Sequence, residues 1–207
     1  MPFVVPPLLL AVVLVALGQV AWAGGLALLA LSVLLFFRVP RIKGTAEPDL
    51  VLAAAFGRVT AVDRTRAPTL GDQEFQRIVT FLSVFDVHIQ RCPVSGRVKE
   101  RSHFSGRKVA AFRKDANEVN ESEISVIEGP AGQTFAVQQI VGLIARRIVC
   151  YLEPGQRIER GESMGLIRFG SRVDLYVPLD YEVLVQPGDK LRAGETIVAR
   201  PGGARAD

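Results

Sequence analysis

Ionisable side chains are absent from the first 37 residues of this 207-residue chain, which contain no Asp, Glu, Lys or Arg. All 25 basic and 21 acidic residues therefore lie in the remainder, which has the composition of an ordinary folded domain. Hydrophobic residues make up 49% of the sequence, a fraction that excludes a disordered chain.

Cysteine and histidine are also scarce, with two residues of each. Cys92 and Cys150 are too few for a disulfide framework and lack the C-x-x-C spacing of a zinc site, so we expect buried free thiols and no metal. The net charge is +4, but residues of both signs are interspersed. Without a basic stripe and interleaved aromatic residues, the sequence argues against a nucleic-acid partner.

One long apolar run occupies residues 3–37. It has room for one membrane-spanning helix of about 20 residues. It equally fits a tight helical hairpin broken at Gly18-Gln19 or at Gly24-Gly25. A cleaved signal peptide is disfavoured, although Ala21-Trp22-Ala23 resembles a cleavage site, because no basic residue precedes the apolar run.

Basic residues follow this run at once, at Arg38, Arg41 and Lys43. The positive-inside rule places that end in the cytoplasm. We therefore predict a membrane anchor over residues 1–43 and a folded domain, catalytic or binding, over residues 44–207. The expected location is the inner cell membrane, with this domain on its cytoplasmic side.

Short alternating segments separated by glycine predict a mostly β domain after residue 48. The expected strands are 49–62 with a bend at Gly57, 78–89, 134–141, 148–152 and 173–177. Within 78–89, the two-residue period places Asp86 and His88 together on the polar face.

A nine-residue repeat, P-G-x-x-[IL]-x-x-G-E, occurs at 154–162 and again at 187–195. Two such turn–strand–turn units predict a small sandwich or barrel-sandwich hybrid with pseudo-symmetric hairpins similar to those of lipoyl- and biotinyl-carrier domains. A carrier displays a lysine at the hairpin tip between the two units. The segment 167–174 has none, which disfavours a carrier and leaves Gly170-Ser171 at the expected tip.

Two residue pairs could carry chemistry. Glycine at Gly170 permits a strained peptide, and the Ser171 hydroxyl could attack the preceding carbonyl if a base assists it. His88 is the candidate base, with Asp86 as the carboxylate that orients it. His103 falls in an expected loop and is interpreted as structural or exposed.

Several ordered motifs resemble phosphatidylserine decarboxylase proenzymes of the short bacterial and archaeal type. The resemblance includes the histidine segment 81–96, the Asn-Glu-Val-Asn-Glu stretch at 117–121, Gly142–Ile148, and 160–174 around Gly170-Ser171. With the apolar N-terminus, it covers nearly the whole chain.

The resemblance implies a self-processing carboxy-lyase that converts phosphatidylserine to phosphatidylethanolamine. The chain would break between Gly170 and Ser171 after the serine oxygen attacks the glycine carbonyl, giving a β chain of residues 1–170 and an α chain of residues 171–207. β-Elimination and hydrolysis would turn Ser171 into a pyruvoyl cofactor. Its carbonyl would form a Schiff base with the substrate amine and accept the electrons released with CO₂.

His88 would act as the base for processing and later as the proton donor to the product. Arg168 or Arg172 could hold the lipid phosphate. The implied partners are phosphatidylserine in the membrane and the two chains of one precursor, and a homodimer stays open.

One departure from the family pattern affects the site. Relatives carry Pro-Ala-Asp-Gly near the first soluble strand, and its aspartate belongs to an Asp-His-Ser triad. Here Phe56 stands at that position, and Arg91 stands where some relatives have a second histidine. Asp86 or Asp63 would have to supply the acid.

A different class of function also fits the anchor and the repeat. A membrane-anchored β-sandwich adaptor without enzymatic activity, working in an export or envelope assembly, would need neither Ser171 nor His88. Replacing Ser171 with alanine separates the two hypotheses.

Overall fold

The computed structural model describes residues 5–36, 38–42, 47, 49–67, 70–111, 113, 115–143, 147–167 and 171–202. It divides into two compact units, Met1–Pro40 and Arg41–Asp207, which are described separately.

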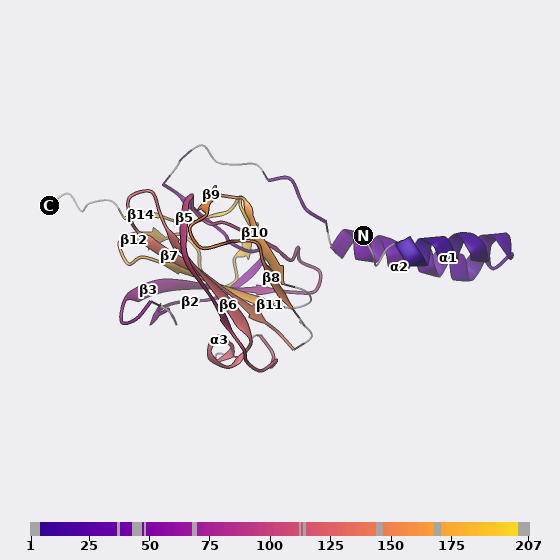
Figure 1. The fold of residues 1–207 in the computed structure, drawn as a ribbon, viewed down its shortest axis with the longest axis horizontal. Helices are drawn as coiled ribbons and strands as arrows, with labels where there is room; N and C mark the ends of the chain where they lie inside the picture. The colour runs from indigo at the N-terminus through magenta and orange to yellow at the C-terminus, as the bar shows by residue number, and fades with distance from the viewer. Residues whose placement is uncertain are drawn as a thin grey trace. The chain divides into compact units, whose positions relative to one another are not determined.

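The first unit is a helical hairpin of α1 (Val5–Ala16) and α2 (Val20–Phe36) (Figure 1). The chain reverses at Gly18, whose φ of 73° is in the left-handed region, so of the two breaks considered the one at Gly18-Gln19 is observed. The alternative at Gly24-Gly25 is wrong, because both glycines lie inside α2. The buried alanines Ala11, Ala23 and Ala30 are small enough to let the helices approach closely. None of the helices in the described ranges is both long and apolar enough to span a bilayer.

The second unit is mostly β, as predicted. Its described elements are β1 (Val51–Leu52), β2 (Gly57–Arg66), β3 (Glu74–Leu82), β4 (Ile89–Arg91), β5 (Gly96–Phe104), α3 (Ala116–Val119), β6 (Ser122–Glu128), β7 (Thr134–Val141), β8 (Ile148–Cys150), β9 (Arg157–Ile158), β10 (Ser163–Ile167), β11 (Ser171–Val177), β12 (Tyr181–Val183), β13 (Lys190–Leu191) and β14 (Ile197–Pro201).

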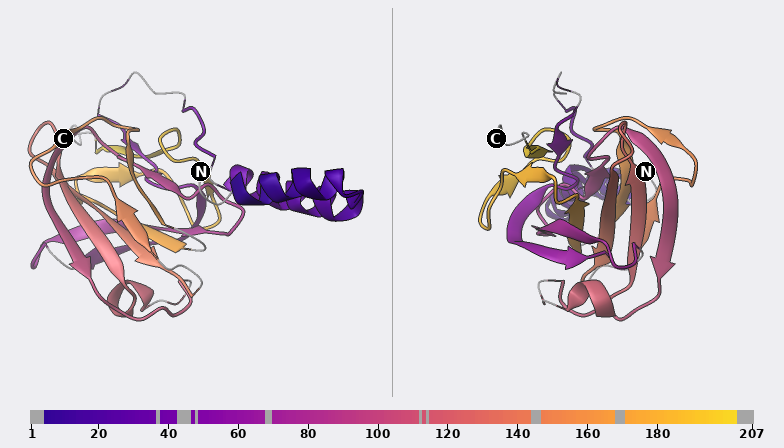
Figure 2. Two further views of the ribbon diagram at one scale, coloured as in Figure 1. Left: turned by 45° about the vertical axis from the view of Figure 1, so that its right-hand side comes forward. Right: turned by 90° about the vertical axis from the view of Figure 1, so that its left-hand side faces the viewer.

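These strands form one eight-stranded antiparallel sheet and two small sheets. The large sheet has the order β13-β2-β3-β11-β7-β6-β5-β9, and the small sheets have the orders β1-β14-β12 and β4-β10-β8. Figure 2 shows the long strands curling around the shorter ones. One apolar core lies on the inner face of the large sheet and includes side chains from both of its halves, such as Val59, Val98 and Val173.

The sequence repeat appears as two equivalent edges of the large sheet. β9 pairs with β5 at one edge, and β13 pairs with β2 at the other. The bonds match as well: Gly155 N donates to Val98 O at 2.7 Å, and Gly188 N donates to Val59 O at 2.8 Å. Pseudo-symmetric units are therefore present, while the likeness to a lipoyl carrier stays a prediction.

This internal symmetry explains why Ser171 lies where it does. One half contains β1 to β3 and β11 to β14, and the other half, β4 to β10, is inserted between them. β3 and β11 are paired like the hairpin β6–β7, but they are joined through the entire second half. Ser171 is the first residue after the chain returns from this insertion.

Two local predictions were wrong. The strand expected over 78–89 stops at Leu82, because residues 83–86 form a turn before β4 begins at Ile89. The tip expected at 167–174 is not exposed around Ser171, since the stretch from Ser171 onward is a fully buried strand in the middle of the large sheet.

Candidate active site

Ser171 opens the central strand β11, where it pairs with Leu82 of β3 and Val141 of β7. Its side chain is completely buried, and Oγ has no hydrogen-bond partner among the described residues. A buried hydroxyl without a partner costs about 1–3 kcal/mol, so its retention needs an explanation. Gly170 and Arg168, both predicted site residues, lie outside the described residues.

His88 is buried with 4% of its surface exposed. Its Nδ1 lies 2.7 Å from the main-chain oxygen of Asp86. Since a carbonyl can only accept, Nδ1 carries the proton in this bond and Nε2 is the basic nitrogen of the neutral ring. Burial lowers the pKa of His88 below its usual 6.5, which favours the neutral form that a general base requires.

Asp86 orients His88 through its main-chain carbonyl, whereas the sequence predicted its carboxylate. Its carboxylate Oδ2 accepts hydrogen bonds from Ser83 N at 2.9 Å and Ser83 Oγ at 2.8 Å, so it closes the turn 83–86. The main-chain carbonyl, not the carboxylate, holds the imidazole. The expectation failed because these residues are not in a strand, so their side chains do not share a face.

His88 is also tied to the segment that leads into Ser171. Ile167, the last residue of β10, donates its main-chain N–H to His88 O at 3.3 Å. The neighbouring pair Leu166 and Ile89 joins β10 to β4. Ile167 precedes Ser171 by four residues in the chain, and Leu82, the ladder partner of Ser171, precedes His88 by six. That His88 acts on Ser171 stays a prediction.

Two buried glutamines, absent from the sequence prediction, support this region. Gln139 Nε2 donates to Gln90 Oε1 at 2.8 Å, and Gln90 Nε2 donates to His88 O at 2.9 Å. Gln139 Oε1 is buried without a hydrogen-bond partner among the described residues. Gln139 pairs with Val173 in the ladder and therefore lies on the same face of the sheet as Ser171. The sequence signal that could have identified Gln139 was the polar pair Gln138-Gln139 within an otherwise apolar predicted strand.

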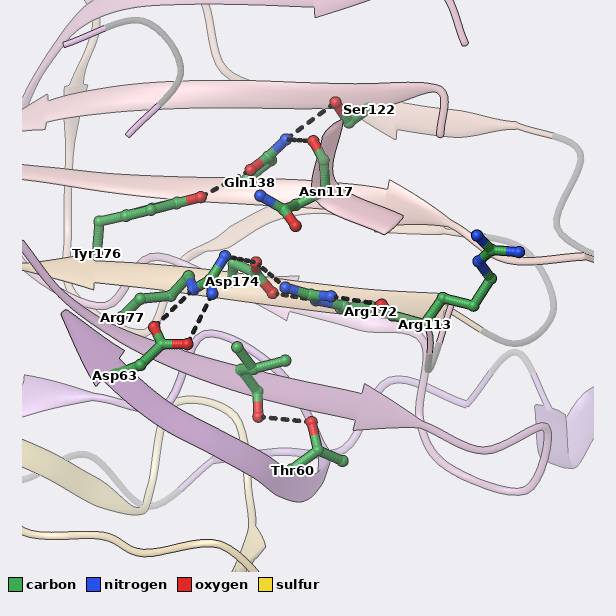
Figure 3. Close-up of polar contacts among 11 residues, drawn as sticks. Thr60, Asp63, Arg77, Arg113, Asn117, Ser122, Gln138, Arg172, Asp174 and Tyr176 are labelled. Atoms are coloured by element: carbon green, nitrogen blue, oxygen red, sulfur yellow. Dashed lines mark hydrogen bonds and ion pairs between the residues drawn. The ribbon is translucent and has the colours of Figure 1, made fainter. Parts of the chain in front are cut away.

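The outer face of β11 carries a buried ion-pair network (Figure 3). Arg172 binds Asp174 through Nε and Nη2, both at 2.6 Å. Arg77 Nη1 lies 3.6 Å from Asp174 and its other nitrogens bind Asp63. Burial raises the pKa of the Asp174 carboxyl, while the guanidinium groups of Arg172 and Arg77 oppose that rise. The pairing of Arg172 argues against its predicted role in holding a lipid phosphate.

We expect Asp174→Asn to destabilise the folded chain by about 3 kcal/mol or more, because it leaves the Arg172 guanidinium buried without its anion. The measurement is thermal unfolding of the full chain in detergent. Asp63→Asn is the matched control: the Asp63 side chain is 42% exposed, so its loss should cost less than about 1 kcal/mol. Equal losses in the two variants would contradict this account of the network.

The Asn-Glu-Val-Asn-Glu stretch acts as a clamp on β7. Asn120 donates from Nδ2 to Val141 O and to Val109 O, each at 2.8 Å. The main-chain oxygen of Asn117 accepts from Gln138 Nε2 at 3.0 Å (Figure 3). The bond to Val141 O fixes the end of β7 that pairs with Ser171.

Phe56, at the expected acid position, packs in a small apolar cluster with Val87, Ala193 and Ile89. This cluster includes both chain neighbours of His88, and Phe56 can supply no charge there. Asp63, the other predicted acid, is bound to Arg77 at the outer face. Arg91 is buried and donates to Gly161 O at 3.0 Å.

The remaining predicted structural residues have ordinary roles. Cys92 is a buried free thiol, as predicted, and burial raises its pKa to about 12. Cys150 is free and half-buried. His103 lies on β5 rather than in a loop, with Nδ1 3.0 Å from Glu123 Oε2.

Fold and site together define a class: a β protein of two similar halves, with a buried serine that has no hydrogen-bond partner among the described residues at the start of a central strand, and a buried histidine just after the strand β3 that pairs with it. Comparison with known proteins gives the family. The profile of phosphatidylserine decarboxylase matches residues 29–199. The chain belongs to the phosphatidylserine decarboxylase family, a family of enzymes.

Individual relatives match over most of their length. The phosphatidylserine decarboxylase proenzyme of Nocardia farcinica is 45% identical over 204 residues, covering 96% of this chain and 84% of the relative. That of Polynucleobacter asymbioticus is 44% identical over 184 residues, covering 89% and 85%. That of Burkholderia ambifaria is 40% identical over 198 residues, covering 96% and 92%. The family resemblance is thus confirmed, and the adaptor hypothesis is set aside.

Proposed function

We propose that this chain is a self-cleaving precursor that decarboxylates phosphatidylserine to phosphatidylethanolamine. The observation that carries the proposal is the completely buried Ser171 Oγ, which has no hydrogen-bond partner among the described residues and lies in the region that holds His88. A hydroxyl left without a partner is free to act as a nucleophile. The names of the relatives, which call them proenzymes, support the processing step.

In the processing step, Ser171 Oγ attacks the carbonyl carbon of Gly170. The C–O bond of an ester forms, the C–N bond of the peptide breaks, and the hydroxyl proton passes through His88 to the departing amine. Loss of the Cα proton then expels the carboxylate of Gly170 from Cβ. Water replaces the nitrogen, which leaves as ammonia, so that residue 171 ends as a pyruvoyl group.

The surroundings of residue 171 fit this group. Its methyl would occupy the place of the serine CH₂OH and would remove the buried hydroxyl that lacks a partner. A methyl suits the core face here, where Ser171 pairs with Leu82 and Val141. When bound there, the pyruvoyl carbonyl supplies an acceptor for the electrons released as CO₂ leaves.

The other residues of the site bind and move protons. His88, once protonated, would donate a proton to the substrate carbon that loses CO₂. Gln139 Oε1 offers a buried acceptor on the same face, suited to an N–H group of the serine headgroup. Gln90 holds both the Gln139 amide and the main chain of His88 in place.

The N-terminal hairpin supports a membrane location for this activity. Large apolar side chains around it are exposed, among them Leu9 at 63%, Trp22 at 72% and Leu28 at 66%. Such a surface is suited to lipid rather than water. We propose that residues 1–43 anchor the chain in the inner membrane, with the basic residues that follow on the cytoplasmic side.

Decarboxylation is tested directly with the purified full chain in vesicles that contain phosphatidylserine labelled at the headgroup carboxyl. We expect release of labelled CO₂ with an equal amount of phosphatidylethanolamine. A cleaved chain that releases no CO₂ from this lipid would contradict the proposed substrate, while leaving self-cleavage intact.

A further inference from the structure

The two most exposed large apolar side chains in the described part of residues 41–207 are Phe85, at 86%, and Leu143, at 70%. Both lie at the end of the sheet that holds Ser171. Phe85 follows Leu82 by three residues and Leu143 follows Val141 by two, and Leu82 and Val141 are the ladder partners of Ser171. The most exposed apolar groups of this unit therefore flank its buried reactive serine.

Phe85 lies at the tip of the turn 83–86, which hydrogen bonds hold in a fixed shape. Asp86 N donates to Ser83 O at 3.0 Å, and the Asp86 carboxylate accepts both the N–H and the hydroxyl of Ser83. This turn directs Val84 and Phe85 outward, with Val84 40% exposed. The same turn holds His88 through the Asp86 carbonyl, so the exposed tip and the base are one local structure.

Leu143 lies at a second tip, in the connection between β7 and β8. This connection exposes Leu143 and also Arg147, the residue immediately before β8. An exposed apolar side chain and an exposed cation are both compatible with the interfacial layer of an anionic bilayer.

We propose that Val84, Phe85 and Leu143 form a lipid-contacting rim that enters the bilayer surface and sets the reactive serine against the lipid headgroups. This inference rests on the proposed function, because a substrate held in a bilayer must reach a buried residue 171 without leaving the membrane. The rim shortens that path, since its two tips flank the strand end where residue 171 lies.

Fluorescence of the full chain tests the rim without using activity. Trp22 is the single tryptophan, so Phe85→Trp in a Trp22→Phe background gives one reporter at the rim. Leu179→Trp in the same background is the matched control, because Leu179 is 44% exposed but follows the opposite end of β11. The vesicles contain phosphatidylcholine and phosphatidylglycerol, with or without brominated acyl chains, and hold no substrate.

We expect brominated lipid to quench the tryptophan at position 85 and to shift its emission to the blue, with little change at position 179. An unquenched tryptophan at position 85, or equal quenching at both positions, overturns the rim. This result does not depend on cleavage or turnover, so it separates failure of the rim from failure of the proposed function.

Kinetics give a second readout. Phe85→Ser combined with Leu143→Ser should raise the KM for phosphatidylserine in vesicles by about tenfold or more, since two apolar contacts with lipid are lost. Leu179→Ser should leave that KM unchanged. An unchanged KM in the double variant, measured on a fully cleaved and active chain, contradicts the rim.

Discussion

Ser171→Ala leaves the purified chain whole and lowers decarboxylation by more than about 10⁴-fold, the scale of loss when a catalytic nucleophile is removed. The reason is local: residue 171 supplies both the oxygen that opens the peptide bond and the carbon skeleton of the electron acceptor. Gel electrophoresis of the purified chain and release of CO₂ from phosphatidylserine measure the two effects.

The control for this variant is Ser125→Ala. Ser125 is also completely buried, on β6, but its hydroxyl lies 3.7 Å from Cys150 Sγ. Its loss removes a buried hydroxyl without touching the cleavage site, so we expect normal cleavage. A Ser171→Ala chain that is still cut after residue 170, or that still decarboxylates at the unmodified rate, would refute the role of Ser171.

His88→Gln slows self-cleavage by about 10²- to 10⁴-fold, the usual contribution of a positioned general base. Glutamine keeps a polar side chain of similar size but cannot take up a proton. The measurement is the rate at which newly synthesised precursor is converted to two chains. His103→Gln, at a half-exposed histidine on β5, should cleave at the unmodified rate, and equal slowing in both variants would exclude a specific role for His88.

The same residue sets a pH dependence. Since burial lowers the pKa of His88 below 6.5, the neutral base predominates at pH 7, and the cleavage rate should fall only when the pH drops through the lowered pKa. The unfolded chain takes up this proton near pH 6.5, before the folded chain does. Stability contributed by neutral His88 is therefore complete above that pH and is lost on further acidification, a loss that His88→Gln should lack.

Local pattern predicted much of the fold. Alternation located Thr134–Val141, and the repeat located the two short edge strands β9 and β13. Glycine at Gly18 marked the helical break because its φ is positive there. These features depend on residues close together in the chain, so their physical causes are visible in the sequence.

Features that depend on distant contacts were missed. The turn at 83–86 is closed by the Asp86 side chain, and this bond interrupts an alternation that otherwise continues to Ile89. Ser171 was predicted to lie in an exposed tip because no nearby residue indicates that β3 and β7 pair with its strand on either side in the sheet. Placing it there requires the pairing of strands that are separated by an entire inserted half.

Residue types and motifs pointed to Ser171 and His88, whose catalytic roles stay predictions. They did not point to the partners Gln90 and Gln139, because a glutamine acquires a role only when burial removes its alternative bonds to water. The burial of Arg172 was also missed, although Asp174 two residues later on the same face of a strand was the available signal.

Mass spectrometry of the purified full chain, before and after borohydride treatment, tests the central claim most directly. We expect two chains, residues 1–170 and 171–207, with the second carrying at its N-terminus a carbonyl that gains hydrogen on reduction. An intact chain, or a second chain beginning with an ordinary serine, in a preparation that releases CO₂ from phosphatidylserine would contradict the account.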